Sequence, residues 1–266
     1  MANLKIGISG LGLIGGSILK RLHEKGFYTI AVSKSSCEKA KSWADVCSVE
    51  LGALKEADVV FVCNEMHKTP EILDEFEGFL PSEVLVTDVC SLKSFVLQKT
   101  RPYSFVGSHP MAGTEFTGFE ASFPSLFEGA KWALTEQNET LEFLISEMGA
   151  KPVFIEANEH DRAVAKISHL PMLLAHALFM STADDKCAKL LAASGFRDMT
   201  RLAMGSPYLS GDMLELNEKN IELALDETLK ALEYLKKLPK EERIEAFAKN
   251  AHNRAEMYDK QGKNTL

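Results

Sequence analysis

The chain has 266 residues, of which 45% are hydrophobic and 26% charged, and its net charge at pH 7 is −8. This composition is typical of a globular protein, and the acidic balance argues against a nucleic-acid-binding protein. Five scattered cysteines without a CxxC pair argue against a disulfide framework or a zinc site. We find no signal peptide and no apolar run of about 20 residues, so we expect a cytoplasmic protein without a membrane span.

Short apolar runs alternate with helical patterns over the first 157 residues. The predicted strands are residues 4–9, 28–33, 58–63, 83–89, 104–108, 131–135 and 152–156. Several of these runs are apolar almost throughout, as in parallel strands that are buried on both faces. The pattern predicts an α/β fold with a doubly wound sheet.

After residue 157 the pattern becomes helical, and we predict two domains, residues 1–157 and residues 158–266. The predicted helices are residues 159–183, 184–194, 211–237 and 239–260. Asn158 is the expected N-cap of the first one. An apolar stripe runs along the later helices and comprises Leu223, Leu225, Leu229, Leu232 and Leu235. It is either a core face or a dimer surface, because a helical part of this size makes a thin core.

The segment GISGLGLIGGSILKRL follows the first predicted strand and opens a helix, in the pattern G-x-G-x-x-G. Gly10 permits the tight turn, Gly12 lets a pyrophosphate approach the backbone, and Gly15 allows the helix to pack closely on the strand. The free N–H groups at the start of the helix then bind the phosphates. The segment predicts a dinucleotide site, since glycine-rich packing alone would not require this context.

The end of the second strand, AVSKSS, indicates which dinucleotide is bound. Enzymes that use NAD usually carry an acidic residue here for the ribose 2′-hydroxyl, whereas this chain offers hydroxyl groups and Lys34. We therefore expect NADP, with NAD as the alternative; Lys34 is otherwise a solvated loop lysine. The predicted cofactor-binding residues are Gly10, Gly12, Leu13, Ile14, Gly15, Ser33, Lys34, Ser35, Cys63 and Ser91.

Two further segments follow predicted strands. In TDVCSLKS, Ser91 and Lys93 could face the crevice where such sheets bind ligands, although Ser91 could also be an ordinary helix N-cap. In GSHPMAGTE, Pro110 biases His109 towards an extended conformation on a constrained loop. Histidine titrates near neutral pH, so His109 is a candidate for proton transfer.

The helical part contains HDRAVAKISHLP and ASGFRDMTRLA. Pro171 should kink its helix and turn Ser168 and His169 into a cleft. Arg201 lies three residues after Asp198, so the pair can brace each other on a helix and present an arginine to a carboxylate, or form a surface ion pair. We predict no metal site, because His160 and His169 are nine residues apart.

The segments GLGLIGGS, TDVCSLK, GSHPMAGTE, HDRAVAKISHLP and SGFRDMTRLA together resemble the prephenate/arogenate dehydrogenases of tyrosine biosynthesis, and most closely the NADP-using arogenate dehydrogenases. The resemblance implies a Rossmann domain followed by a helical domain through which two chains form a homodimer. It also implies the NAD(P)-dependent oxidative decarboxylation of prephenate or arogenate.

The resemblance also implies residue roles. His109 would hydrogen-bond the 4-hydroxyl of the substrate ring and polarise it as a hydride leaves the same carbon, and Ser91 would support it. The residues that it places around the substrate are Arg201, His169, Glu115 and Asp198. Arg201 would bind a carboxylate and His169 would line the pocket. The two acidic residues would form an ionic network with Arg201 at the pocket mouth.

The chain departs from the family pattern at three places. Met172 stands in HLPM where many members have a second histidine, which could favour arogenate. VCNEM stands where Thr-Pro is more usual, with Glu65 unexplained near the cofactor crevice, and Cys90 stands where Gly or Ala is common. One alternative is a β-hydroxyacid or imine reductase, for which Lys166 would be the catalytic residue. The other is a protein that binds NADP without catalysis.

Overall fold

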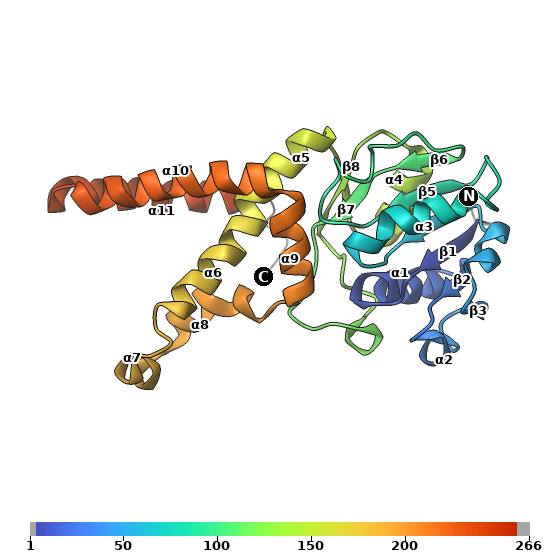
Figure 1. The fold of residues 1–266 in the computed structure, drawn as a ribbon, viewed down its shortest axis with the longest axis horizontal. Helices are drawn as coiled ribbons and strands as arrows, with labels where there is room; N and C mark the ends of the chain where they lie inside the picture. The colour runs from blue at the N-terminus through green and yellow to red at the C-terminus, as the bar shows by residue number, and fades with distance from the viewer. Residues whose placement is uncertain (1–3, 260–266) are drawn as a thin grey trace.

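The structure is a computed structural model that describes residues 4–259, in which a strand-rich part is followed by a helical part (Figure 1). Six parallel strands form the main sheet in the order β3-β2-β1-β4-β5-β6. The strand order reverses between β1 and β4, because β2 and β3 follow on one side and β5 and β6 on the other, so that a crevice opens at the carboxyl ends of β1 and β4. The predicted doubly wound sheet is confirmed.

The main sheet and its connections are followed by a second sheet in the order β7-β8-β9. The elements of this part are β1 (Lys5–Ser9), α1 (Leu13–Glu24), β2 (Tyr28–Val32), α2 (Cys37–Ala40), β3 (Val46–Ser48), η1 (Leu51–Glu56), β4 (Val59–Val62), η2 (Met66–Lys68), α3 (Thr69–Phe76), β5 (Leu85–Asp88), β6 (Ser104–Val106), β7 (Ser108–Pro110), η3 (Phe119–Ala121), β8 (Lys131–Leu134), α4 (Glu139–Glu147) and β9 (Lys151–Phe154). The sequence did not predict β3, whose three residues are only half buried.

Apolar side chains cover both faces of the main sheet. Ile6 and Ile8 of β1 join a buried cluster with α1 and α4 on one face. Val60 and Val62 of β4 join a second cluster with η1 and α3 on the other. Strands that bury both faces read as continuous apolar runs, which explains why the sequence located them.

The chain passes from the main sheet to the second sheet at Gly107. The predicted strand 104–108 is in fact divided, because β6 ends one residue before Gly107 and β7 begins one residue after it. Thr135 approaches closely, and a Cβ at position 107 would lie 3.2 Å from its side chain. His109 is therefore not on an irregular loop as expected; it is the central residue of β7 and pairs with Ala133 of β8. A three-residue strand that ends in proline lacks the alternation that predicts a strand.

The helical part begins with one long helix interrupted by a π-helical segment. Its elements are α5 (Ala157–Val164), η4 (Ala165–His169), α6 (Leu170–Met180), α7 (Lys186–Leu191), α8 (Ser194–Thr200), η5 (Arg201–Met204), α9 (Pro207–Leu216), α10 (Glu218–Lys237) and α11 (Lys240–Asp259). The predicted N-cap Asn158 is wrong, since the Glu156 carboxylate accepts the first free N–H, from Glu159 at 3.0 Å. The predicted helix 211–237 is broken at Asn217.

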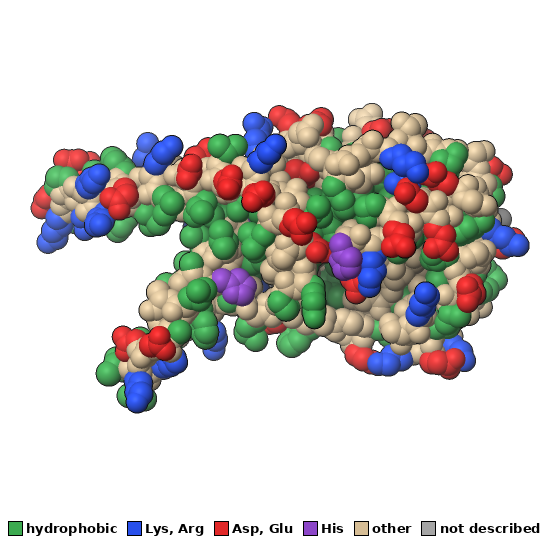
Figure 2. Space-filling model, in the orientation of Figure 1, with side chains coloured by type: hydrophobic (Ala, Val, Ile, Leu, Met, Phe, Trp, Pro, Cys, Tyr) green, Lys and Arg blue, Asp and Glu red, His purple; other side chains and the backbone are tan. Residues whose placement is uncertain are grey.

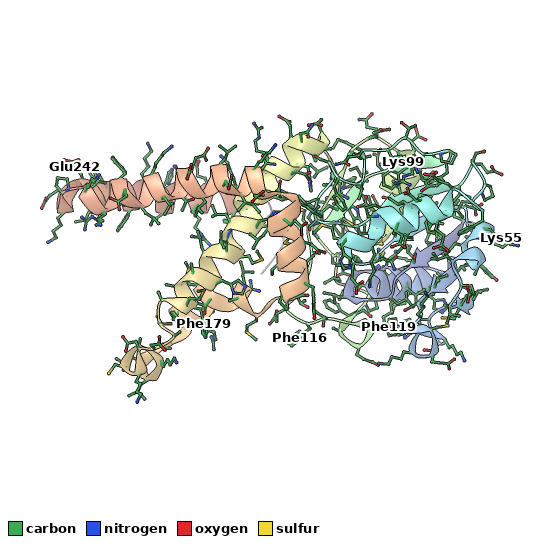
Figure 3. All side chains as sticks on the ribbon, in the orientation of Figure 1. Lys55, Lys99, Phe116, Phe119, Phe179 and Glu242 are labelled. Atoms are coloured by element: carbon green, nitrogen blue, oxygen red, sulfur yellow. The ribbon has the colours of Figure 1, made fainter. Side chains whose placement is uncertain are left out.

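Two helical arms project from the strand-rich part. In Figure 3, Glu242 lies at the far end of the arm formed by α10 and α11, and Phe179 lies on the second arm. Hydrophobic side chains gather between the arms (Figure 2). The segment Ala157–Met180 is long and apolar enough to span a membrane by length and composition alone, which the sequence had not led us to expect. It also holds three buried polar residues, His160, Asp161 and His169.

Candidate functional site

The glycine-rich turn between β1 and α1 has the shape of a phosphate cradle. Gly10 has φ of +90°, and a Cβ there would lie 2.8 Å from the Cys63 backbone. A Cβ at Gly15 would lie 2.0 Å from the Gly10 carbonyl oxygen. A Cβ at Gly12, by contrast, would meet no described atom within 4 Å. The two outer glycines are thus required by close packing, and Gly12 borders open space.

The start of α1 faces that space without a cap from the protein. Gly12 is the N-cap and supplies no side-chain hydrogen bond. The N–H groups of Leu13 and Ile14 in the first turn therefore have no intrahelical partner, and such groups bind anions. These residues fit a dinucleotide, with the pyrophosphate at the helix N-terminus and Cys63 behind the turn.

The end of β2 leads into a turn rich in hydroxyl groups. The Ser36 N–H donates to Ser33 Oγ at 3.1 Å, and the hydroxyls of Ser35 and Ser36 lie 3.4 Å apart. Lys34 is exposed and forms no ion pair with any residue between 4 and 259. Its ammonium is therefore free to bind an anionic group beside the crevice.

A buried ionic network lies beneath the crevice at the end of β5. Lys93 Nζ donates to Asp88 Oδ2 and, at 2.6 Å, to the Ser108 carbonyl oxygen. The Ser108 N–H donates to the other Asp88 oxygen at 3.2 Å, and the Cys90 N–H donates to Oδ2 at 2.9 Å. Asp88 and Lys93 are fully buried, so Lys93 does not face the crevice as expected. The network holds β7, and with it His109, against the end of β5.

Ser91 follows this network and is only partly buried. Its hydroxyl donates to the sulfur of Met66 in η2, at 3.6 Å. No helix begins at Ser91, so its interpretation as a helix N-cap is wrong. A thioether is a weak acceptor, and the hydroxyl is therefore readily available to a ligand.

His109 belongs to a chain of hydrogen bonds that joins the two parts of the molecule. His109 Nδ1 lies 3.0 Å from His160 Nε2, and His160 Nδ1 lies 2.9 Å from Asp161 Oδ1. The Asp161 carboxylate also accepts the backbone N–H groups of Lys93 at 2.8 Å and Ser94 at 2.9 Å. The strand-rich part supplies His109, and α5 supplies the other two members of the chain.

The hydrogen bonds from His109 through His160 to Asp161 fix where the protons of the two histidines lie. Burial tends to raise the pKa of Asp161, but hydrogen bonds from His160, Ser94 and Lys93 together hold it below its usual value. The carboxylate is therefore ionised and accepts a hydrogen bond from His160 Nδ1–H, which makes Nε2 of the neutral His160 ring an acceptor. His109 Nδ1 must then donate, and His109 Nε2 is left as a free acceptor. Burial lowers the pKa of His109 well below 6.5, so this histidine is neutral.

His169 on η4 is connected to the same chain through Asn217. Asn217 Nδ2 donates to the Asp161 carbonyl oxygen at 2.8 Å and lies 3.2 Å from His169 Nδ1. His169 Nε2 is buried and has no hydrogen-bond partner in the described part of the chain. A buried polar atom of this kind is costly unless a ligand satisfies it, which fits the expected place of His169 in a pocket.

We expect acid to destabilise the protein through His169. Burial lowers its pKa from 6.5 to about 4, so between these values the unfolded chain binds more protons and stability falls as the pH falls. At about 1.4 kcal/mol per pH unit, this window accounts for roughly 3 kcal/mol. Urea unfolding at pH 7.5, 6 and 5 should show a smaller loss for His169→Gln than for the wild type. His252→Gln, on the exposed end of α11, is the control, and equal losses in all three proteins would contradict the assignment.

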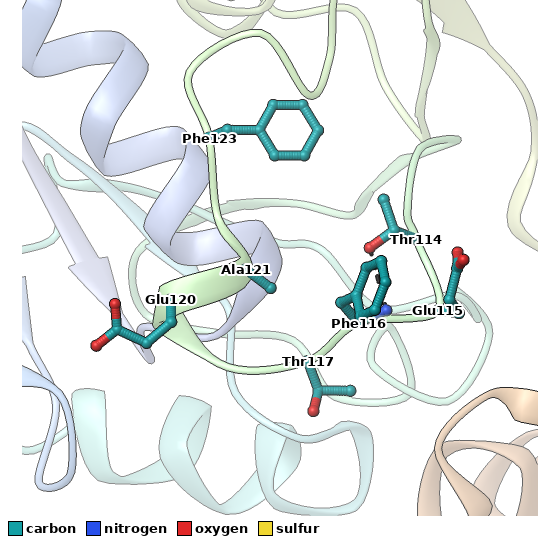
Figure 4. A pocket seen from close by; sticks show the side chains of 7 residues that line it. All are labelled: Thr114, Glu115, Phe116, Thr117, Glu120, Ala121 and Phe123. Atoms are coloured by element: carbon teal, nitrogen blue, oxygen red, sulfur yellow. Dashed lines mark hydrogen bonds between the residues drawn. The ribbon is translucent and has the colours of Figure 1, made fainter.

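Glu115 lies on the loop that follows β7. This loop borders a hollow of about 680 Å³ lined by Thr114, Glu115, Phe116, Thr117, Glu120, Ala121 and Phe123. The close-up shows the ring of Phe116 beside Glu115, with Phe123 across the hollow and Glu120 turned away (Figure 4). Glu115 forms no ion pair with any of the described residues.

The structure does not assemble the expected network around Arg201. Asp198 lies 3.8 Å from Arg197 in an exposed ion pair and does not brace Arg201. Arg201 is exposed on η5 and has no ion pair within residues 4–259. Its predicted role as a carboxylate ligand therefore has no support from neighbouring charges in a single chain. Lys166, on which a reductase would rely, is half exposed and pairs with Glu227 at 2.6 Å.

Sequence reasoning missed three residues of the site. His160 and Asp161 looked like a polar start to a helix, and Asn217 lay inside a predicted helix. The one available signal was the adjacent His-Asp pair, because a carboxylate beside a histidine can orient it.

Two family models match most of this polypeptide. The family model for the nucleotide-binding domain of prephenate dehydrogenase matches residues 14–148, and the model for its dimerization domain matches residues 156–252. A prephenate dehydrogenase of Lactococcus lactis is 33% identical over 75% of this chain, and the match spans 61% of that relative.

Two solved structures are similar over nearly the whole chain. Synechocystis arogenate dehydrogenase superposes with a TM-score of 0.81 at 31% identity, covering 96% of this chain and 100% of that one. Prephenate dehydrogenase from A. aeolicus, in complex with hydroxyphenyl propionate and NAD⁺, gives 0.85 at 26% identity, covering 97% and 99%. The glycine-rich turn and the histidine chain thus lie in a fold that these proteins share.

Proposed function

The chain belongs to the prephenate dehydrogenase family, and on that premise we propose that it catalyses the oxidative decarboxylation of prephenate or arogenate. The products would be 4-hydroxyphenylpyruvate or tyrosine, and the reaction would take place in the cytoplasm. The observation that carries the proposal is the free Nε2 acceptor of His109, fixed by His160 and Asp161 at the edge of the crevice.

His109 performs the proton transfer in this proposal. Its Nε2 accepts the proton of the ring 4-hydroxyl while the hydride leaves the carbon that bears this hydroxyl, so the C–OH group becomes a carbonyl and both transfers need one geometry. The nicotinamide cofactor accepts the hydride when it is bound. As the ring carboxylate leaves as carbon dioxide, the electron pair of the broken bond moves into the ring, the carbonyl oxygen takes the proton back from His109, and the ring becomes an aromatic phenol. The Ser91 hydroxyl, once it leaves the Met66 sulfur, supports His109 at the ring hydroxyl.

The other predicted site residues keep their proposed roles. His169 offers a hydrogen bond inside the pocket, Arg201 binds a carboxylate of the substrate, and Glu115 and Asp198 set the charge at its mouth. Met172 is buried on α6, which directly follows His169. Because a thioether replaces an imidazole there, we propose arogenate as the preferred substrate.

The four pairings of substrate and cofactor test this function directly. Purified protein is mixed with prephenate or arogenate and with NADP⁺ or NAD⁺, and absorbance of the reduced cofactor is followed at 340 nm. We expect turnover with at least one pairing and the highest kcat/KM with NADP⁺. Absence of turnover in all four would refute the function, and tight NADP binding without turnover would identify a binding protein.

We propose that NADP is preferred because Lys34 and the hydroxyls of Ser33 and Ser35 receive the 2′-phosphate. Lys34→Ala should raise the KM for NADP⁺ by about 10-fold, the value of one charge-assisted hydrogen bond, and leave the KM for NAD⁺ unchanged. The matched control is Lys41→Ala, which removes a nearby lysine that is paired with Glu38. An equal effect on both cofactors would contradict this assignment.

We further propose that residues 1–157 bind the cofactor and that residues 158–266 form a homodimer. The apolar stripe of α10 is not a core face in the single chain, since Leu223, Leu229 and Leu232 are 63%, 50% and 53% exposed. Apolar patches of this kind mark contacts between chains, and the matched family model is that of a dimerization domain.

A further inference from the structure

Asn217 is a buried residue that interrupts the helix between α9 and α10. Its backbone leaves the helical region with φ of −121° and ψ of 20°, and the residue is 4% exposed. A buried amide at a helix break requires partners for all its polar atoms. Those partners determine which way the amide faces.

The orientation of the amide follows from two contacts that do not involve a histidine. Asn220 Nδ2 donates to Asn217 Oδ1 at 2.8 Å. The other end of the amide faces the Asp161 carbonyl oxygen at 2.8 Å, and a carbonyl can only accept. Nδ2 is therefore the atom nearest to His169, and Nδ2 can only donate.

This orientation decides the protonation of His169. Its Nδ1, at 3.2 Å from Asn217 Nδ2, must accept, so the single proton of the neutral ring lies on Nε2. That Nε2 is the buried atom without a partner among the described residues. The ring is neutral at physiological pH, because burial lowers its pKa to about 4.

We propose that Asn217 is a positioning residue that fixes the Nε2–H tautomer of His169 and thereby presents a neutral donor to an oxygen atom of the substrate. An ammonium group cannot occupy the same position, because it has no lone pair to accept the bond. Asn217 thus selects an oxygen over a nitrogen cation at this point of the pocket. For its kinetic test this inference depends on the proposed function.

The tautomer can be measured without any substrate. The chain has seven histidines, and ¹⁵N shifts of labelled protein distinguish Nδ1–H from Nε2–H rings, with His169→Gln identifying the resonance. We expect Nε2–H for His169 in the wild type. In Asn217→Asp the carboxylate can only accept, so the proton should move to Nδ1. An Nδ1–H ring in the wild type, or an unchanged ring in the variant, would overturn the proposal.

Kinetics separate positioning from a general structural role. Asn217→Asp should lower kcat/KM by about 10- to 100-fold, the value of one hydrogen bond to a charged group, while Asn253→Asp on the exposed face of α11 should not. A glutamine at position 169 carries an N–H donor that has no tautomer, so in the His169→Gln background Asn217→Asp should change kcat/KM less than threefold. The same loss in both backgrounds would show that Asn217 acts only on the fold. If the wild type has no turnover, the proposed reaction fails while the tautomer measurement still stands.

Discussion

His109→Asn is expected to lower kcat by about 10³-fold, within the range that general acid–base catalysis contributes. Asparagine retains a side-chain donor for His160, at 3.0 Å from the present Nδ1, but offers no group that can take a proton. The glycine-rich turn does not involve position 109, so the dissociation constant for NADPH should stay within about twofold. Stopped-flow turnover and fluorescence titration measure the two quantities.

The pH profile provides the companion measurement for the wild type. Because burial keeps the pKa of His109 well below 6.5, the acidic decline of kcat/KM should lie below the ordinary histidine range. His252→Asn, on the exposed face of α11, should behave as the wild type does. Near-normal turnover of His109→Asn would remove His109 from the reaction.

Lys93→Met should reduce the free energy of unfolding by about 3–5 kcal/mol, the usual cost of removing one partner of a buried ion pair. The ammonium is fully buried and contacts both Asp88 and the Ser108 carbonyl oxygen. Methionine fills a similar volume but leaves the Asp88 carboxylate without a countercharge. Urea unfolding at pH 7.5 measures the change.

Two further variants test whether that loss comes from the buried ion pair. Lys99→Met removes an exposed lysine that pairs with Asp74 at 3.2 Å, and it should cost less than about 1 kcal/mol. Asp88→Asn combined with Lys93→Met removes both charges and should recover part of the loss. A change below about 1 kcal/mol for Lys93→Met would mean that Asp88 is not held as a buried carboxylate.

The parts of the fold that were predictable depend on local patterns. Continuous apolar runs located the strands of the main sheet, and spacing alone identified the steric roles of Gly10 and Gly15. β7 could not be predicted, because its three residues are ordered by contacts with Asp88 and β8.

The site was only partly predictable for a related reason. His109 and His160 are 51 residues apart, and their contact depends on how α5 docks against the second sheet. Asn217 continued a helical pattern, and only its buried partners show why the helix breaks there. The ionic network expected from the family resemblance is not formed within one chain. The partners of an exposed charge such as Arg201 depend on a bound ligand or a second chain, which a local sequence pattern does not specify.

The hydrogen bonds of Asp161 couple the orientation of His109 to the contact between the strand-rich and helical parts of the molecule. Its carboxylate accepts the N–H of Lys93 on Oδ1 and the N–H of Ser94 on Oδ2, and Oδ1 also orients His160. If α5 moved away from the sheet, the segment would lose its acceptor and His109 would lose the partner that fixes its tautomer in the same motion. The docking of α5 against the strand-rich part is thus the same contact that orients His109 as an acceptor.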